Sequence, residues 1–318
     1  MYNITARKRI VVLGAGFAGL QAAKVLAWFF PRQVILIDKR DYHLFTPELH
    51  ELDEEKAKLP IKTKAEFIQK EVEDFHNLDY DYLVLATGAK VNYCGIPGLQ
   101  ENALTFYTLE DIKKLRQVPA GEILIIGGGA NGVELAAHLA QKLEGEKVKI
   151  VEASSQILPD LDESLRKKAQ KRLQNLGVEI ICSRRLVKVE PGTVFFENGE
   201  NLKYNNLIWT GGLMMGQYKV DEYLRVMGEN NIFAAGSCSS ANPGMIRPAM
   251  EQAKIVAQNI ARTIKGKPLI VYKKRFYGIF VTLGDYYALG KIGRIKMSGF
   301  LTWLIKKIIK FLYKKSYV

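Results

Sequence analysis

Short apolar runs alternate with glycine turns and longer apolar stretches along the first part of the chain. The run RIVVL, residues 9–13, has the length of a buried strand and leads directly into GAGFAGL. QAAKVLAWFF follows, which favours a helix that ends before Pro31, and QVILID then predicts a second strand ending at Asp38. This order of strand, turn, helix and strand predicts a βαβ unit.

The same order of elements occurs again from Glu122. EILII predicts a strand, GGGANG a glycine turn, VELAAHLAQKL a helix, and KVKIVEA a strand whose acid is Glu152. Two G-x-G-x-x-G turns, each followed about twenty residues later by an acid, indicate two dinucleotide sites. The expected fold class is therefore α/β, with two Rossmann-like dinucleotide-binding domains.

The glycines of the two turns have matching physical tasks. The first permits a tight turn, the second lets the backbone approach a pyrophosphate, and the third lets helix and strand pack closely. The N–H groups at the start of each helix favour phosphates. These glycines are Gly14, Gly16 and Gly19 in the first turn and Gly127, Gly129 and Gly132 in the second.

The acids that end the second strands bear on the choice of nucleotide. Asp38 and Glu152 can each accept hydrogen bonds from ribose hydroxyls. Glu152 would repel a 2′-phosphate, and its neighbours Ala153, Ser154 and Ser155 offer no cation. The second site is therefore expected to prefer NADH over NADPH.

The basic side chains are concentrated in the last fifth of the chain. Of the 318 residues, 48% are hydrophobic and 25% charged, as in a folded protein of about two domains. Residues 252–318 hold fifteen Lys and Arg and one acid, whereas the rest holds 31 basic and 32 acidic side chains. The net charge of +13 thus indicates one basic surface. The lack of basic excess elsewhere, and the apolar residues between the C-terminal lysines, argue against nucleic-acid binding.

The cysteines show no spacing typical of a disulfide scaffold or a metal site. Cys94, Cys182 and Cys238 lie far apart, with no C-x-x-C, so no metal is expected. The N-terminus lacks the pattern of a secretory signal, and no run of about 18 uncharged apolar residues predicts a spanning helix. We expect a cytoplasmic protein whose location depends on its C-terminal segment.

The two turns, together with DYHLFTPELHE, YDYLVLATGA and NIFAAGSC, resemble those of two-dinucleotide-binding flavoproteins. The resemblance is strongest to type II NADH dehydrogenases, the single-chain NADH:quinone oxidoreductases, and covers nearly the whole chain. It implies a glutathione-reductase-like arrangement, with FAD at the first turn and NADH at the second. It also implies hydride transfer from NADH to FAD, then two-electron reduction of a membrane quinone without proton pumping, and it allows a homodimer.

The resemblance divides the chain into domains. An FAD domain of residues 1–108 and 232–275 is interrupted by an NADH domain of residues 109–231. Residues 276–318 are expected to form two strands and a membrane-docking helix.

The resemblance also assigns site residues. The catalytic candidates are Glu134, near the nicotinamide, and Arg247 and Glu251, where the family has a glutamine motif near the quinone. The cofactor-binding candidates are Gly14, Gly16, Phe17, Ala18, Gly19, Asp38, Lys39, Thr46, Pro47, Ala86, Thr87, Gly88, Gly127, Gly129, Ala130, Asn131, Gly132, Glu152, Gly211, Gly236 and Ser237. His43 and His50 are interpreted as ordinary polar groups near the flavin segment.

Two departures from the family pattern leave alternatives open. Ser237 stands where the family has an aspartate that binds the flavin's ribityl chain, and Gln252 lies one place from the glutamine motif. One alternative is sulfide:quinone or other sulfur oxidoreduction, which would use Cys94 or Cys238. The other is a membrane-associated sensor that binds FAD and NADH with little turnover.

The C-terminal run TWLIKKIIKFLYKK predicts an amphipathic helix. Its apolar face is formed by Leu304, Ile305, Ile308, Ile309, Phe311 and Leu312, with lysines opposite. We expect this helix to lie in an anionic membrane surface with its lysines at the headgroups, although the apolar face could instead pack on the protein. Truncation after Met297 is then expected to release the protein from liposomes and to spare reduction of the flavin by NADH.

Overall fold

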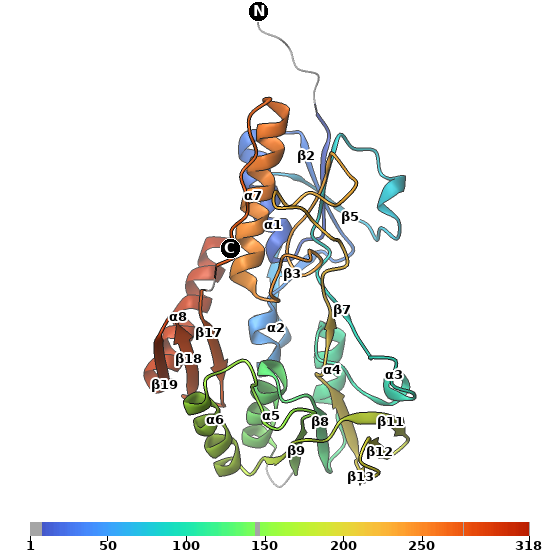
Figure 1. Cartoon of the computed structure of the whole chain (residues 1–318), viewed down its shortest axis with the longest axis vertical. Helices are drawn as coiled ribbons and strands as arrows, with labels where there is room; N and C mark the ends of the chain where they lie inside the picture. The colour runs from blue at the N-terminus through green and yellow to red at the C-terminus, as the bar shows by residue number, and fades with distance from the viewer. Residues whose placement is uncertain (1–7, 144–146, 276, 318) are drawn as a thin grey trace, which may run out of the picture.

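The computed structural model describes residues 8–143, 147–275 and 277–317 (Figure 1). The predicted domain limits at residues 1, 276 and 318 lie outside the described residues. Two parallel sheets form the two halves of the molecule, and a small antiparallel sheet with a long helix lies beside the second. The predicted α/β class with two Rossmann-like units is confirmed.

The first sheet is assembled from both ends of the chain. Its strand order is β16-β6-β1-β2-β5, and all neighbours are parallel. The strands are apolar because helices α1 and α7 cover one face and loops the other. The elements are β1 (Ile10–Leu13), α1 (Phe17–Phe29), β2 (Val34–Asp38), β5 (Glu66–Gln69), β6 (Tyr82–Leu85), β16 (Ile232–Ala234) and α7 (Ile246–Ile264).

The second sheet repeats the first arrangement with one strand fewer. Its order is β10-β9-β8-β14, again parallel throughout, and it packs against α5 and α6 on one side and a three-stranded antiparallel sheet on the other. The elements are β8 (Ile123–Ile126), α5 (Ala130–Lys142), β9 (Val148–Val151), α6 (Glu163–Asn175), β10 (Glu179–Ile181), β11 (Leu186–Glu190), β12 (Thr193–Phe196), β13 (Asn201–Lys203) and β14 (Asn206–Trp209).

Short elements join the two halves. The chain passes from the first half to the second through β7 (Lys90–Val91) and returns through β15 (Leu213–Met214). The two strands pair in antiparallel fashion, so the two connections run side by side. The segment after β2 also reaches toward α5. The remaining connecting elements are β3 (Tyr42–Leu44), η1 (Thr46–Glu51), α2 (Glu54–Ala57), β4 (Lys58–Pro60), η2 (Phe75–Asn77), α3 (Leu99–Asn102) and α4 (Leu109–Arg116).

The C-terminal segment packs on the second half through α5. It contains β17 (Ile279–Thr282), β18 (Ala288–Ile292), β19 (Ile295–Gly299) and α8 (Phe300–Tyr317). The sequence predicted two strands here, and this was wrong because the residues after Gly293 turn back and pair with β18 as a third strand. Val281, Leu283 and Leu289 share one buried cluster with Val133 and Ala137 of α5.

Candidate functional site

The first glycine turn leaves the N-terminus of α1 open to a ligand. A Cβ at Gly19 would overlap the Gly14 carbonyl oxygen, whereas one at Gly16 would meet nothing within 4 Å. Gly14 has φ +106°, a left-handed conformation that favours glycine. No side chain caps α1 and no acid lies in its first turn, so no side-chain cap takes the hydrogen bonds of its first N–H groups. These features suit a dinucleotide pyrophosphate.

The second turn has the same geometry. A Cβ at Gly132 would overlap the Gly127 carbonyl oxygen, and the space around Gly129 is open. No side chain caps the N-terminus of α5. Gly211, which follows β14, lies against Gly127, with its Cα 2.9 Å from where a Gly127 Cβ would stand. The second turn therefore offers a second phosphate site.

The two acids at the strand ends each hold their turn in place. One oxygen of Asp38 accepts a hydrogen bond from the Ala15 N–H at 2.6 Å, and one oxygen of Glu152 accepts from the Gly128 N–H at 2.7 Å. The second oxygen of each acid accepts from the N–H two residues further along, at 2.8 Å and 2.7 Å. Both Glu152 oxygens and the Asp38 oxygen bonded to Ala15 retain a lone pair that can accept from a ribose hydroxyl, whereas the other Asp38 oxygen also accepts from the Arg40 Nε at 3.5 Å.

The return segment after β16 meets the first turn. Gly236 has φ +81°, and a Cβ there would lie 2.9 Å from the Ala18 Cβ. The Gly236 N–H donates to the side-chain oxygen of Gln252 at 3.0 Å, and Gln252 is fully buried. The structure thus brings Ala18 and Gly236 together. Gln252 is a supporting residue that the sequence did not select.

The remaining predicted cofactor residues differ in their surroundings. The Ala86 carbonyl and the Thr87 backbone border Gly14, so this strand end also faces the first turn. Thr46 and Pro47 begin η1, which packs against α5. Lys39 points to the surface, where its ammonium pairs with Glu71 at 3.0 Å. The ion pair with Glu71 therefore holds the Lys39 side chain at the surface.

Glu134 of α5 lies at the centre of a buried polar cluster. Its Oε1 accepts hydrogen bonds from the Thr282 N–H at 2.7 Å and from the Lys306 ammonium of α8. Lys306 also donates to the Thr282 hydroxyl at 2.7 Å. The other oxygen, Oε2, lies 3.7 Å from the His50 Nδ1, beyond hydrogen-bonding distance.

The charges of this cluster follow from burial and pairing. Burial alone would raise the pKa of Glu134, but Lys306, His50 and the two hydrogen bonds outweigh it and lower the pKa to about 2. Burial lowers the pKa of His50 to about 3, so the ring is neutral near pH 7. Because His50 is neutral, its contact with Glu134 is not an ion pair, and Lys306 is the counter-ion of Glu134.

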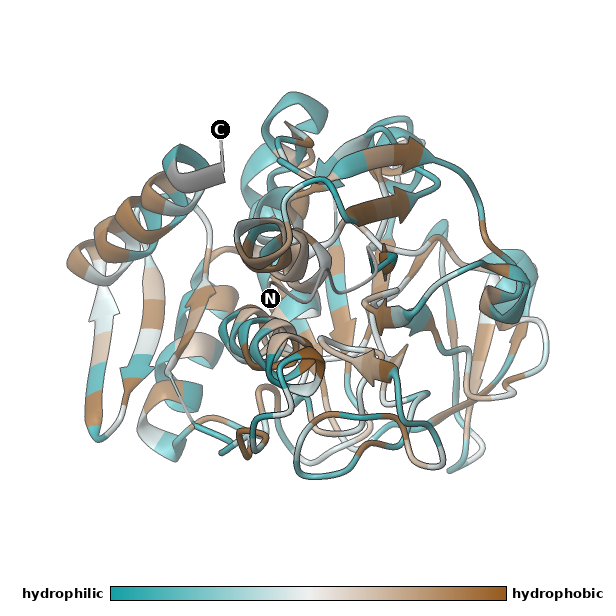
Figure 2. Cartoon of the chain, turned by 90° about the horizontal axis from the view of Figure 1, so that it is seen from above, coloured by the Kyte–Doolittle hydropathy of each residue, from teal (hydrophilic) through white to brown (hydrophobic). Residues whose placement is uncertain are grey.

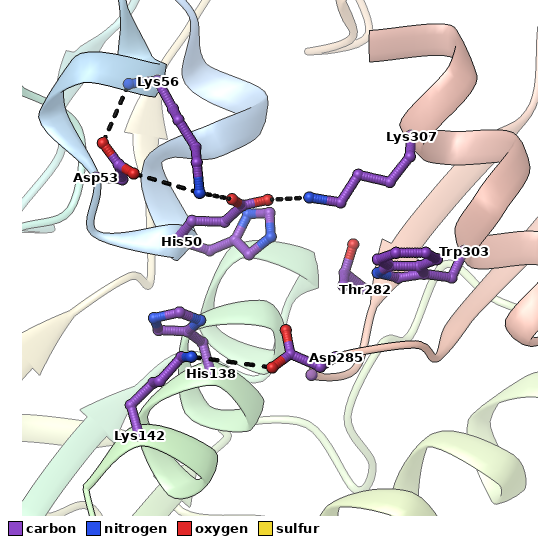
Figure 3. Close-up of a pocket in the computed structure, with 11 residues that line it drawn as sticks. His50, Asp53, Lys56, His138, Lys142, Thr282, Asp285, Trp303 and Lys307 are labelled. Atoms are coloured by element: carbon purple, nitrogen blue, oxygen red, sulfur yellow. Dashed lines mark hydrogen bonds and ion pairs between the residues drawn. The ribbon is translucent and has the colours of Figure 1, made fainter. Parts of the chain in front are cut away.

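A polar pocket of about 350 Å³ adjoins this cluster (Figure 3). Histidines and lysines from three segments surround it, with Thr282 and the Trp303 ring facing α5 (Figure 3). His50 is 5% exposed, and the structure shows no hydrogen bond to its ring from the described residues. Burial also lowers the pKa of His138 on the opposite wall. The pocket therefore presents two imidazole rings beside a buried ion pair.

A second histidine joins α8 to the first turn. His43 Nδ1 lies 3.1 Å from the Ala15 carbonyl and its Nε2 lies 3.1 Å from the Tyr313 hydroxyl. Burial lowers the pKa of His43 to about 4, so Nδ1–H donates to the carbonyl and Nε2 accepts from Tyr313. The Tyr313 ring stacks on Phe45 and also contacts Phe17.

Residues 50–253 match the model of the family described as pyridine nucleotide-disulphide oxidoreductase. The chain belongs to this family.

Curated relatives of this family member carry more specific names. It is 30% identical to demethylphylloquinone reductase NdbB of Synechocystis, over 97% of this chain and 92% of the relative. It is 27% identical to a type II NADH:quinone oxidoreductase of Haemophilus influenzae, over 90% of this chain and 87% of the relative. The resemblance to type II NADH dehydrogenases stated from the sequence is confirmed.

A solved structure shows the same fold. NDH2 of Plasmodium falciparum in complex with NADH superposes with a TM-score of 0.80 at 18% identity, covering 97% of both chains. At this identity the likeness concerns the fold alone, including the arrangement of the two parallel sheets.

This family member docks α8 on its body through the charged face of the helix. Lys307 pairs with Glu51 at 2.9 Å, Lys310 lies 3.4 Å from Glu51, and Lys314 pairs with Glu48. The exposed side chains along the helix include Leu301, Leu304, Ile308, Ile309, Phe311 and Leu312. The predicted amphipathic helix is present, but four of its lysines, Lys306, Lys307, Lys310 and Lys314, meet carboxylates of the protein rather than pointing away from it.

The outward direction of the apolar face follows from these ion pairs. Because η1 supplies two glutamates, the lysine side of α8 turns inward, and the suggestion that the apolar face packs on the protein is wrong. Figure 2 shows α8 at one edge of the molecule with hydrophobic turns along it. Among the described residues, no helix has both the length and the hydropathy needed to cross a membrane.

Arg247 and Glu251 are not part of the Glu134 cluster. They pair with each other on α7 at 3.7 Å, and the Arg247 side chain is 65% exposed. Its guanidinium lies 5.5 Å from the centre of the Tyr277 ring, whose hydroxyl donates to Glu251. Their contacts are those of a surface ion pair, and their catalytic role stays a prediction.

The three cysteines of this family member are all free. Cys238 is fully buried, and its thiol lies 3.2 Å from the Leu85 carbonyl, whereas Cys94 is exposed. Burial raises the pKa of Cys238, which disfavours the reactive thiolate.

The sequence did not identify Lys306, Thr282 or Tyr313 as site residues. All three come from the C-terminal segment. Thr282 and Lys306, which bond to Glu134, follow it by more than 140 residues. No local motif marks them, because a lysine on an amphipathic helix is usually a surface residue. Only the packing of α8 against η1 and α5 brings Lys306 to Glu134 and Tyr313 to His43.

Proposed function

We propose that this chain oxidises NADH with FAD as its cofactor and delivers two electrons to a lipid quinone. The observation that carries this proposal is the pair of glycine turns, alike in geometry and both without a cap. One turn suits FAD and the other the reduced nucleotide that supplies it. The names of the relatives support a quinone as the electron acceptor.

The first turn holds FAD in this proposal. The α1 N-terminus binds the pyrophosphate, Asp38 the adenosine ribose, and Gly236 and Ser237 the ribityl chain. FAD, when bound, accepts a hydride from NADH and passes two electrons to the acceptor. Ser237 offers a neutral hydroxyl, so its hydrogen bond lacks the charge assistance of a carboxylate.

The second turn holds NADH. The Glu152 carboxylate lies beside Gly128 and is fixed there by two backbone N–H groups. Its negative charge repels the 2′-phosphate of NADPH and accepts a hydrogen bond from the 2′-hydroxyl of NADH. The chain is therefore selective for NADH.

The Glu134 cluster lies between the two nucleotide sites in this proposal. Glu134 is on the helix that begins at the second turn, and His43 ties the first turn to α8. Glu134 contacts Lys306 directly as its counter-ion. An ammonium held in place next to the reacting groups can stabilise developing negative charge and donate a proton.

The apolar face of α8 holds the protein at the cytoplasmic face of the cell membrane, as a peripheral protein. The side chains that support this proposal are exposed, lie along one helix and face away from the body. A monomeric soluble protein rarely exposes a continuous apolar strip of this kind. This face contacts the acyl chains in which a lipid quinone dissolves.

Stopped-flow spectroscopy of the flavin tests the function. The purified protein with its flavin is mixed with NADH without oxygen and then with a naphthoquinone. We expect the flavin absorbance to bleach with NADH and to return with the quinone faster than with oxygen. Absence of bleaching would remove the NADH assignment, and reoxidation by quinone no faster than by oxygen would remove the quinone assignment.

The two alternatives are tested with the same assay. Sulfur oxidoreduction requires a thiol at the site, so Cys94→Ser or Cys238→Ser would abolish it, whereas the proposed reaction tolerates Cys94→Ser. A sensor would bind NADH tightly and leave the flavin oxidised. The homodimer stays a prediction, which sedimentation of the purified protein can test.

A further inference from the structure

The reaction proposed above consumes a proton. NADH, one proton and one quinone give NAD+ and one quinol, so the hydride and its two electrons come from NADH and the remaining hydrogen comes from water. Glu134 and Lys306 are both shielded from solvent, with side chains 12% and 13% exposed. A buried donor that gives up a proton in each turnover must recover it through a defined contact.

Thr282 provides this contact. Its hydroxyl accepts the hydrogen bond from Lys306 at 2.7 Å, and the same residue lines the polar pocket. Figure 3 shows the side chain of Thr282 between α8 and α5, where the pocket begins. A hydroxyl can donate and accept at once, so it can pass a proton from one side to the other.

The pocket itself is suited to hold water. It has a volume of about 350 Å³ and is lined by charged groups and two imidazoles. Its rim reaches the surface, because the side chains of Lys56, Lys142 and Asp285 are more than half exposed. A polar space of this size holds several hydrogen-bonded water molecules.

The other groups beside Lys306 are less suited to the relay. Glu134 stays ionised at neutral pH because Lys306 and its hydrogen bonds lower its pKa to about 2 against the effect of burial. His50 is neutral, and its ring is 3.7 Å from Glu134. The titratable groups that face this region from the described residues are Glu134, His138 and Lys142 from α5, His50 and Glu51 from η1, Asp53 and Lys56 beside η1, Asp285 after β17, and Lys307 and Lys310 from α8.

We propose that the Thr282 hydroxyl relays protons from the polar pocket to Lys306. When the N–H bond of Lys306 breaks and the O–H bond of the quinol forms, Thr282 gives its hydroxyl proton to the Lys306 amine. In the same concerted step Thr282 takes a proton from a pocket water, so that no alkoxide forms, and bulk solvent returns a proton to that water. This inference rests on the proposed function, and Thr282 acts through Lys306 without touching the substrate.

Removal of the Thr282 hydroxyl by substitution tests the relay. Thr282→Val keeps the shape and the backbone N–H bond to Glu134 but removes the hydroxyl. Thr282→Ser keeps the hydroxyl. Thr302→Val is the matched control, since Thr302 is buried in α8 and does not line the pocket. The flavin-loaded protein is studied in single-turnover mixing with NADH and a naphthoquinone, in H2O and D2O, with a pH-indicator dye.

The relay predicts a change confined to proton uptake and the quinone step. In Thr282→Val we expect the rate of proton uptake and the rate of flavin reoxidation by quinone each to fall about 100-fold, which is the lower end of the effect of a positioned proton-transfer group. The solvent isotope effect on these rates should increase. Bleaching by NADH should stay within twofold of wild type, and Thr282→Ser and Thr302→Val should behave as wild type. Proton uptake by Thr282→Val at the wild-type rate would overturn the relay. If wild-type protein does not bleach, or is not reoxidised by quinone, the proposed function fails instead.

Discussion

Lys306 and Glu134, which are 172 positions apart in the sequence, form a buried ion pair that joins α8 to α5. The side chains are 13% and 12% exposed, and Thr282 forms a hydrogen bond with each of them. A charge in such surroundings is stable only while its partner is present, because water cannot replace the partner. The pair therefore links the stability of the protein to the geometry of the site.

Breaking this pair from one side should destabilise the protein strongly. Glu134→Gln leaves the Lys306 ammonium without its counter-ion, and Lys306→Met leaves the carboxylate alone, so each should lower the free energy of unfolding by about 3–5 kcal/mol. The double variant should lose much less than the sum of the two. Denaturant unfolding of all four proteins measures this difference.

An exposed ion pair serves as the control for this cycle. Lys167 and Glu163 pair one turn apart on α6, with side chains 75% and 66% exposed. Lys167→Met should leave the midpoint of unfolding unchanged. Additive effects of Glu134→Gln and Lys306→Met would show that the two groups act independently and would contradict the assignment.

Acid should begin to destabilise the protein at pH values higher than those at which carboxylates titrate. Burial lowers the folded-state pKa of His50 to about 3 and of His43 to about 4, against about 6.5 for an unfolded histidine. Between those values the unfolded chain binds protons that the folded chain does not, so stability is full above pH 6.5 and falls as the pH decreases. Glu134 adds its own loss of stability from about pH 4.5 downward, since its folded pKa is also lowered.

The histidine contribution can be measured by itself. His50→Gln should reduce the slope of unfolding free energy between pH 6.5 and 4.5, as measured by denaturant unfolding at a series of pH values. A slope that is unchanged in His50→Gln would show that this ring is not held neutral in the folded protein.

Membrane binding should depend more on the apolar face of α8 than on its lysines. Leu304→Ser and Ile308→Ser remove exposed apolar side chains. Each is expected to weaken binding to vesicles about 10- to 150-fold, by loss of apolar burial of roughly 1.5–3 kcal/mol. Lys306, Lys307 and Lys314 are already paired with glutamates. Wild-type protein should thus still bind neutral vesicles, as measured by flotation.

Point substitutions replace truncation as the test of docking. Cleavage after Met297 would divide β19 and remove the counter-ion of Glu134, so it would change more than docking, and its effect on the flavin reaction stays a prediction. Lys315→Gln is the control, because Lys315 is exposed on α8. It should weaken binding several-fold on anionic vesicles only, at about 1 kcal/mol per lysine. Equal binding by Leu304→Ser and wild type would contradict docking through this face.

The choice of nucleotide should depend on the Glu152 charge. Glu152→Gln can keep only one of the two hydrogen bonds from Gly128 and Ser154, because an amide has a single acceptor oxygen. We expect kcat/KM for NADH to fall about tenfold and that for NADPH to stay the same or rise, as expected for loss of one charged hydrogen bond. An equal fall for both nucleotides would mean that Glu152 only supports the turn.

The local parts of the site could be predicted because their geometry is contained in a short segment. Each glycine turn and its acid lie within about 25 residues, and the structure shows Asp38 and Glu152 bonded to their turns. The faces of α8 were also predictable from its period. A helical projection states which residues share a face, but it does not say which face meets the protein.

The orientation of α8 depends on residues that the sequence places far away. Glu48 and Glu51 pair with Lys314 and Lys307 across more than 250 positions, and no pattern within the helix records them. For the same reason Thr282 was not a candidate. Arg247 and Glu251 were chosen by alignment to a motif, and their observed contacts are with each other and Tyr277.

The distance between Glu134 and Lys306 along the chain has a consequence for biosynthesis. The ribosome completes the second glycine turn and α5 long before residue 306 is made, so the nascent protein carries the Glu134 carboxylate without its counter-ion. Until then water or protonation must satisfy this group. The two parallel sheets can form during translation, but the buried ion pair forms only when α8 has emerged and docked.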